Sequence, residues 1–419
     1  MGKLTVLFLM LLSVLPVQAQ LKVVGGVVSD LKTGHRLAHV SVQAMCEAPA
    51  GTAGIEAAES VVTNDDGRFT LKSDRKIVSV VVSHIGYSME HVPVSGATLD
   101  IKLKPSMVQL REVTVWTGNP RDLVSLAISR IASNYSSSGE LSACFYRETA
   151  MKRQHYIYVA EGVVDMFKSD YGRQSSHRDR VAIRKGRRLL SPKRGDTLSV
   201  KVTGGPVQPV QLDIVKNAEL LLNAEELSYY DFKLLPPQTI ADRQQFVVRI
   251  DPRSDASAPY ALYHGNLYID CETLAFTRAE LDLDMSNREK ATRLMLVRKP
   301  AGLRFRPREL SLLVDYRMAA DGRCRLSYVR TRFRFNCDWR RRLFATSFTA
   351  TCELAVTDRR ATADGERPIS GRQSFDSRDA FYDKVDYFRD ADFWREYNII
   401  EPTETLDKAI DRLLRGYKN

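Results

Sequence analysis

The 419-residue chain lacks the short motifs from which several enzyme classes are recognised. It has no H-E-x-x-H pair for zinc, no G-x-S-x-G nucleophile elbow and no G-x-x-x-x-G-K-[ST] phosphate loop. None of its seven histidines begins an H-x-x-E, and His35 and His39 fall in a turn and a strand rather than on one helix face. We therefore expect no catalytic residue, no cofactor and no metal site. The alternative left open is a peptidase-like hydrolase whose active site is assembled from scattered residues.

Cysteine is also scarce, with six residues and no CxxC pair. Six cysteines allow fifteen disulfide pairings, and spacing alone does not choose among them. Buried free thiols in strands are at least as well supported as any bridge. The cysteines are Cys46, Cys144, Cys271, Cys324, Cys337 and Cys352.

Long apolar runs are missing after the first twenty residues. Residues 1–19, MGKLTVLFLMLLSVLPVQA, have a basic start at Lys3, an apolar stretch and a small-residue site ending at Ala19. The apolar stretch falls short of the roughly 20 residues that span a membrane. We interpret residues 1–19 as a secretory signal peptide and expect an exported mature chain that begins at Gln20 and has no transmembrane span.

The formal net charge is +11, and the excess of basic residues is concentrated in residues 105–357. Nucleic acid is a poor partner for an exported protein. Anionic lipid, acidic glycan or an acidic envelope protein fits this charge better, and a generally basic, solvated surface is the alternative.

Residues 21–104 read as short strands separated by turns. Residues 21–29 and 37–44 are β-rich, and Asp66-Gly67 between two apolar runs predicts a hairpin. The order "GGVVSDLKTGHRLAHVSV … TNDDGRFTL … IVSVVVSHIGY … LDIKL" resembles the carboxypeptidase-regulatory-like domain. That resemblance implies a seven-stranded, transthyretin-like sandwich without peptidase activity of its own.

The same resemblance bears on location, because such domains are common at the front of TonB-dependent outer-membrane receptors and of other Gram-negative envelope proteins. The following segment, SMVQLREVTVWTG, resembles the stretch that comes after the domain in those receptors. The resemblance therefore implies the periplasm or the periplasmic face of the outer membrane.

From residue 121 onward the pattern changes to a helix followed by a long series of strands. Residues 121–134 have the apolar spacing of an amphipathic helix, and a second helix is expected at 211–227. The segment GNLYIDCETLAFTRAELDLD resembles periplasmic lipoprotein carriers, whose fold is an open, strongly curved barrel. Residues 119–415 as a whole resemble an uncharacterised secreted family with the regulatory-like domain in front. Strands are expected at 141–149, 155–167, 180–186, 229–236, 243–251, 265–270, 274–285, 291–299, 303–316, 323–335 and 344–357.

The expected architecture is therefore mainly β: a sandwich followed by a curved, half-barrel-like antiparallel meander with a few helices. An aromatic tail ends in a helix capped by Thr403. Its aromatic side chains either pack on the sheet or form a binding cluster. The expected divisions are signal peptide 1–19, sandwich 20–104, linker 105–120, helix and sheet 121–357, and tail 358–419.

Two groups of basic residues are candidate anion-binding sites. Residues 172–201 contain ten basic and two acidic side chains, and either a phosphate-bearing glycolipid site or a solvated loop explains them. Two later strands carry arginine at every second position, so each presents one cationic row. The candidates are Arg184, Lys185, Arg187 and Arg188 in the first group, and Arg304, Arg306, Arg308, Arg330, Arg332 and Arg334 in the second.

A turn at residues 319–322 can place the two arginine rows side by side. Six guanidinium groups on one face would repel each other. Either an acidic row on a neighbouring strand, formed by Glu280, Asp282 and Asp284, neutralises them, or they form an open anion site. The function we expect is a non-catalytic envelope protein that binds a partner or ligand, accessory to outer-membrane transport or assembly.

Overall fold

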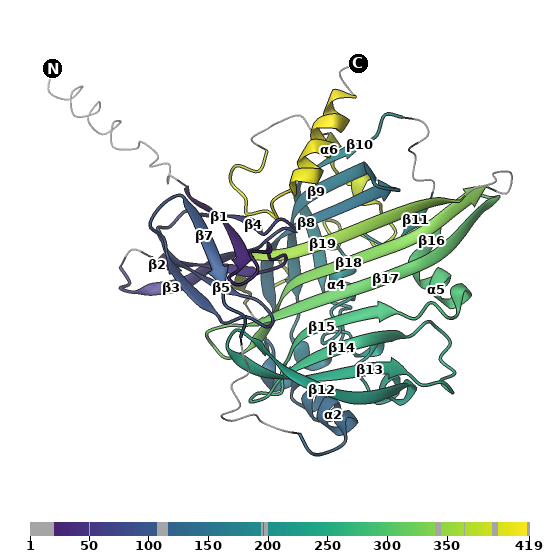
Figure 1. The fold of residues 1–419 in the computed structure, drawn as a ribbon, viewed down its shortest axis with the longest axis horizontal. Helices are drawn as coiled ribbons and strands as arrows, with labels where there is room; N and C mark the ends of the chain where they lie inside the picture. Colours follow the sequence, from purple (N-terminus) through teal and green to yellow (C-terminus); the bar gives the residue numbers. More distant parts are fainter. Residues whose placement is uncertain are drawn as a thin grey trace.

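The computed structural model describes residues 21–49, 51–106, 116–193, 196, 200–339, 345–363, 365–387 and 393–416. The expected signal peptide lies outside these ranges, as does most of the receptor-like segment, at residues 107–115. The described part is mainly β with few helices, which confirms the fold class (Figure 1). None of its helices is long and apolar enough to cross a bilayer.

The N-terminal part forms two small sheets that share one apolar core. One sheet has three strands and the other has four. Alternate residues of each strand are buried between the sheets, as a sandwich requires. The strands, in sheet order, are β4 (Arg68–Ser73), β1 (Lys22–Asp30) and β7 (Thr98–Leu103), then β3 (Ile55–Val62), β2 (Ser41–Glu47), β5 (Ile77–Ser83) and β6 (Glu90–Pro93).

The hairpin expected at Asp66-Gly67 is wrong in one respect. The turn forms, with Gly67 at φ 71°, but it connects β3 and β4, which belong to different sheets. A Cβ atom on Gly67 would lie 2.5 Å from the carbonyl oxygen of Val28, so the chain passes too close for any side chain. The dipeptide therefore identifies a tight turn without identifying the strands that pair.

The second part is one eleven-stranded sheet. Its order shows two meanders, one through β8, β9 and β10 and one from β12 to β19, which join where β19 pairs with β8. All neighbours are antiparallel except β10 and β20. The strands, in sheet order, are β12 (Tyr230–Ile240), β13 (Arg243–Pro252), β14 (Tyr263–Asp270), β15 (Phe276–Leu283), β17 (Leu303–Met318), β18 (Cys324–Trp339), β19 (Thr346–Ala361), β8 (Glu140–Lys152), β9 (His155–Lys168), β10 (Arg180–Leu190) and β20 (Asp386–Tyr387); β11 (Lys201–Val202) and β16 (Leu296–Arg298) form a separate pair.

One face of this sheet, which we call the inner face, carries a large apolar cluster that helices and connecting segments cover. Helix α2 packs beside β12, and the expected helix at 121–134 breaks into α2 and α3 at Arg130. The opposite, outer face is partly covered by the sandwich and the tail. The helices are α2 (Pro120–Ser129), α3 (Ile131–Asn134), α4 (Gln208–Gln211), α5 (Arg288–Met295) and α6 (Glu404–Arg415).

The helix expected at 211–227 is wrong, because α4 ends at Gln211 and only 3-10 turns follow. Asp213 and Lys216 are fully buried, whereas Glu219 and Glu225 of the same segment are exposed. Asp213 binds Lys168 at 2.7 Å, and this buried ion pair decides the local path. The strand expected at 291–299 is also wrong in its first half, which belongs to α5.

The tail wraps around the β10 edge of the sheet. Phe381 packs on the inner face against Tyr146, β20 pairs with β10, and Trp394 packs on the outer face against Phe145. Helix α6 begins as expected, because the Oγ1 atom of Thr403 accepts a hydrogen bond from the backbone N–H of Leu406 at 3.1 Å. The tail thus covers a sheet edge with aromatic side chains.

Candidate functional site

The two arginine rows do not lie side by side, so that expectation is wrong. The β17–β18 pairing places Arg304 opposite Asp338 and Arg306 opposite Asn336, whereas Arg332 lies opposite Ser311. The rows are therefore displaced along the hairpin. The turn at residues 319–322 forms as expected. Because the turn is tight, a residue far from it on one strand pairs with a residue about equally far on the other, so Arg304 lies opposite Asp338 and not opposite an arginine.

Glu280 and Asp282 of the acidic row lie on β15, and Asp284 follows its last residue. Strand β15 pairs with residues 311–315 of β17, beyond Arg304, Arg306 and Arg308, and β17 separates it from β18. The carboxylates that contact the arginines are others. Arg306 binds Asp338 at 3.2 Å, and Arg334 binds Glu309 at 3.0 Å. Partial neutralisation therefore occurs, through acids on the same hairpin for Arg306 and Arg334 and through Asp65 and Glu353 for Arg330.

Four arginines point outward on this hairpin away from the sandwich, and we call them the outer arginine face. Three of them contact the two carboxylates just named: Arg306 binds Asp338, Arg334 binds Glu309, and Glu309 also lies 4.0 Å from Arg332. On β19 the neighbouring outward residues are Ser347, Thr349 and Thr351. Positive charge therefore exceeds negative charge beside a strip of hydroxyl groups. The four are Arg304, Arg306, Arg332 and Arg334.

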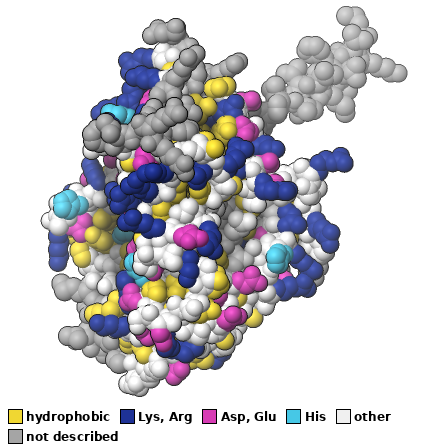
Figure 2. Space-filling view, turned by 90° about the vertical axis from the view of Figure 1, so that its right-hand side faces the viewer, with side chains coloured by type: hydrophobic (Ala, Val, Ile, Leu, Met, Phe, Trp, Pro, Cys, Tyr) yellow, Lys and Arg dark blue, Asp and Glu magenta, His cyan; other side chains and the backbone are white. Residues whose placement is uncertain are grey.

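Arg308 is exposed beside this face at a β-bulge that interrupts the pairing between Pro307 and Glu309. Figure 2 looks at the molecule from the side on which α5 and β16 lie in Figure 1, and it shows many Lys and Arg side chains with carboxylates scattered among them. The basic character of this part of the chain is therefore visible on its surface.

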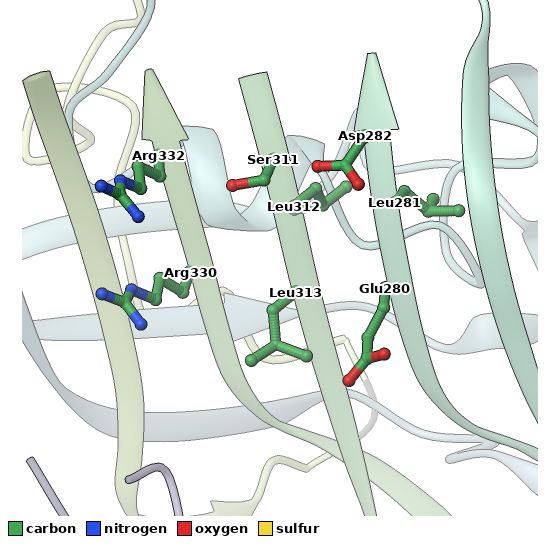
Figure 3. Close-up of a pocket in the computed structure, with 8 residues that line it drawn as sticks. All are labelled: Glu280, Leu281, Asp282, Ser311, Leu312, Leu313, Arg330 and Arg332. Carbon is green, nitrogen blue, oxygen red and sulfur yellow. The ribbon is translucent and has the colours of Figure 1, made fainter. Parts of the chain in front are cut away.

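A hollow of about 230 Å³ lies on the outer face between β15 and β18. Glu280 and Asp282 line one side of it, and the stems of Arg330 and Arg332 line the other (Figure 3). Between them Ser311, a small residue of β17, leaves the space open.

The first basic group, at residues 184–188, lies on β10 rather than in a loop. Arg184 pairs with Asp165, and Arg187 binds the buried Glu161 at 2.9 Å. Lys185 and Arg188 contact the tail, where Lys185 donates to the carbonyl oxygen of Phe393 at 2.9 Å and Arg188 lies 4.8 Å from the ring of Tyr387. Arg187 also lies over the ring of Trp394, so Lys185, Arg187 and Arg188 hold the tail to the sheet, whereas Arg184 bonds within the sheet.

A row of alternating charges crosses the covered part of the outer face, and the sequence analysis missed it. The paired positions are Arg330 with Glu353, Glu353 with Arg147, Arg147 with Glu161, and Glu161 with Arg187. We call it the charge ladder. Burial raises the pKa of Glu161, but the guanidinium groups of Arg147 and Arg187 outweigh that and hold the pKa below its ordinary value. Each strand shows only an ordinary charged residue, so the ladder exists only once the strands are aligned.

The sandwich meets the ladder at its Arg330 end. Arg330 donates to the Nε2 atom of His39 at 2.8 Å, and His39 stacks on Tyr328. Burial, reinforced by the charge of Arg330, lowers the pKa of His39 to about 4. Burial also lowers the pKa of His84 to about 4. Both histidines are therefore neutral at pH 7.

A second polar cluster is buried under the inner face. Asp213 accepts hydrogen bonds from Tyr171 at 2.7 Å and Tyr316 at 2.6 Å, in addition to its contact with Lys168. Lys168 and Asp213 are almost completely shielded from solvent. This geometry fixes the 200–229 segment on the sheet and offers no opening to a substrate. Within the described ranges, no group of three His, Cys, Asp or Glu side chains is arranged to hold a metal.

No protein-family model and no curated protein matches this chain. Among solved structures, a DUF1329 family protein from Desulfovibrio piger covers 57% of this chain and 94% of its own, at 11% identity and a TM-score of 0.24. An outer membrane lipoprotein-sorting protein domain from Vibrio parahaemolyticus covers 60% and 96%, at 12% identity and a TM-score of 0.26. A LolA superfamily protein from Nitrosomonas europaea covers 59% and 96%, at 11% identity and a TM-score of 0.21.

Two of these names belong to the lipoprotein-carrier group that residues 265–284 resemble. None of the three corresponds to the carboxypeptidase-regulatory-like resemblance. All three TM-scores are below 0.5, and we infer the function from the geometry of the chain itself.

Proposed function

We propose that this chain is a non-catalytic, exported envelope protein that binds phosphate-bearing lipid through the outer arginine face. The observation that carries the proposal is the excess of guanidinium groups over carboxylates on one open strip of the sheet, beside Ser347, Thr349 and Thr351. Arginine and hydroxyl groups are suitable donors to phosphate oxygens, and arginine can donate two parallel bonds.

The rest of the chain supports this role without adding chemistry. In our proposal residues 20–104 are a carboxypeptidase-regulatory-like domain, supported by their seven strands in two sheets around a separate core. The linker 105–120, the sheet at 121–357 and the tail at 358–419 complete the division. The protein then acts in the periplasm or at the inner leaflet of the outer membrane, as an accessory to transport or assembly.

Vesicle binding tests the proposal directly. Removing two charges with Arg306→Gln/Arg332→Gln should weaken binding to phosphatidylglycerol vesicles roughly 10- to 30-fold, because each basic residue near an anionic surface contributes about 1 kcal/mol. Binding of the wild type should also weaken as salt is added.

The matched control is Arg253→Gln/Arg293→Gln, which removes two exposed arginines from other parts of the chain, one at the end of β13 and one on α5. If both double variants lose the same affinity, general charge and not this face is responsible. If the wild type does not bind at all, the proposal is wrong. A fluorophosphonate probe on the same sample addresses the hydrolase alternative, which labelling of the chain would favour.

A further inference from the structure

The hollow on the outer face has opposite charges on its two sides. The strand register aligns Asp282 of β15, Ser311 of β17 and Arg332 of β18 in one row. Neighbouring strands lie about 4.8 Å apart, so the backbones of Asp282 and Arg332 are separated by roughly 9.5 Å. The row therefore sets the carboxylate of Asp282 and the stem of Arg332 on either side of a small residue, with the 230 Å³ hollow between them.

Both charges lack a close partner of their own. The side chain of Asp282 forms no hydrogen bond or ion pair with another described residue, whereas that of its neighbour Glu280 binds Arg278 at 2.8 Å. The charge of Asp282 contributes to the raised pKa of Arg249, but the guanidinium of Arg249 binds Asp251 at 2.7 Å. The side chain of Arg332 is 47% exposed, and its contact to Glu309 is 4.0 Å long.

The orientation of the side chains keeps the hollow open. Figure 3 shows the Asp282 carboxylate directed toward Ser311, whereas the guanidinium of Arg332 points away from β15. Asp282 and Arg332 thus do not neutralise each other across the row. Leu313 lies two residues after Ser311 on the same face of β17 and provides an apolar surface beside the Ser311 hydroxyl.

We propose that this hollow binds a phosphoethanolamine group, with the ammonium at Asp282 and the phosphate at Ser311 and at the guanidinium of Arg332, whose half-exposed side chain turns toward the hollow on binding. The two-carbon link between the charges lies against Leu313. This inference rests on the proposed function, because the phosphate half of the site belongs to the outer arginine face.

The chemistry of the walls favours this group over related zwitterions. A choline group is recognised mainly by aromatic rings, and none of the residues that line the hollow is aromatic. A primary ammonium instead donates hydrogen bonds to carboxylate oxygens. In an α-amino acid both charges are attached to one carbon, which spans less of the distance between β15 and β18.

Titration with soluble phosphoethanolamine, inorganic phosphate and phosphocholine tests the proposal on the full chain. The wild type should bind phosphoethanolamine 5- to 10-fold more tightly than either of the others. Asp282→Asn should abolish that preference and leave phosphate binding unchanged, whereas Arg332→Gln should weaken both. The control is Asp231→Asn on β12, an exposed carboxylate at the far edge of the sheet, which should change neither.

The outcomes separate this inference from the proposed function. A wild type that binds phosphate and phosphatidylglycerol vesicles but shows no preference for the amine overturns the inference alone, and so does Asp282→Asn with the preference intact. Vesicles of phosphatidylethanolamine distinguish the source of the group. Tighter binding to these vesicles than to soluble phosphoethanolamine identifies a lipid, and equal binding identifies the free group; both results support the site.

Discussion

Glu161 is the central carboxylate of the charge ladder, and its replacement by glutamine should destabilise the whole assembly of sheet and tail. Its side chain is 2% exposed. It accepts hydrogen bonds from Arg147 at 2.8 Å, Arg187 at 2.9 Å and the indole of Trp394 at 3.0 Å. Glu161→Gln removes the charge while keeping the size, so two buried guanidinium groups lose their shared counter-ion.

The expected loss follows from these contacts. Breaking a buried ion pair by neutralising one partner costs about 3–5 kcal/mol, because the other charge stays buried without compensation. Glutamine keeps one acceptor oxygen, but its amide group donates and would oppose a guanidinium donor. The neighbouring Glu353 still pairs with Arg147 in the ladder and limits the loss. We therefore expect a decrease of about 3–5 kcal/mol in the free energy of unfolding.

Urea unfolding followed by circular dichroism measures this change at each resolved transition. The control is Glu289→Gln, which breaks an exposed pair with Arg293 on α5 and should cost below about 0.5 kcal/mol. Because the pKa of Glu161 is lowered in the folded state, its contribution is present above the ordinary value and is lost as pH falls through the lowered pKa. The variant should lack that acid-dependent loss. A decrease below 1 kcal/mol for Glu161→Gln would refute the reasoning.

Three further predictions concern the remainder of the fold. The folded-state pKa values of His39 and His84 are about 4, so stability present above pH 6.5 should be lost as pH falls toward 4. His39→Asn, which tolerates the φ of 56° at this position, should make the pH dependence of the urea midpoint shallower; an unchanged slope would exclude His39 as a contributor. All six cysteines are free thiols in the structure, so alkylation after denaturation without reductant should add six groups by intact mass, and fewer would reveal a disulfide. Gly265→Ala should lower the melting temperature far more than Gly302→Ala, because a Cβ on Gly265 would lie 2.0 Å from the carbonyl oxygen of Glu280, whereas Gly302 has open space around it; equal losses would contradict the packing argument.

The arginine rows show that residue spacing predicts which side chains of one strand share a face but not which residues of two strands are paired. Period-two spacing correctly predicts that Arg330, Arg332 and Arg334 share one face, because successive side chains of a strand alternate. The partner row cannot be chosen from spacing alone. Register depends on the turn and on the bulge between Pro307 and Glu309, where the apolar positions change from odd numbers (Leu303, Phe305) to even numbers (Leu310, Leu312), a change that the expected pairing did not include.

The 211–227 segment fails for a different reason. Its apolar residues have helical spacing, yet the helix does not form beyond Gln211. Lys168, on β9, supplies the counter-ion for Asp213, and Tyr171 and Tyr316 supply hydrogen bonds to it. Local propensity is worth a few tenths of a kcal/mol per residue, so a buried ion pair and its hydrogen bonds override it.

The sequence by itself determined the mainly β fold, most of the long strands, the N-cap of α6 and the concentration of basic residues in the middle of the chain. These features follow from local periodicity, capping and composition, which act within a few residues. Only the tertiary structure decided the charge ladder, the wrapping of the tail around β10 and the row of Asp282, Ser311 and Arg332. Each of these joins residues far apart in the chain, and their alignment is set by strand order and register, which the burial of the inner face fixes as a whole.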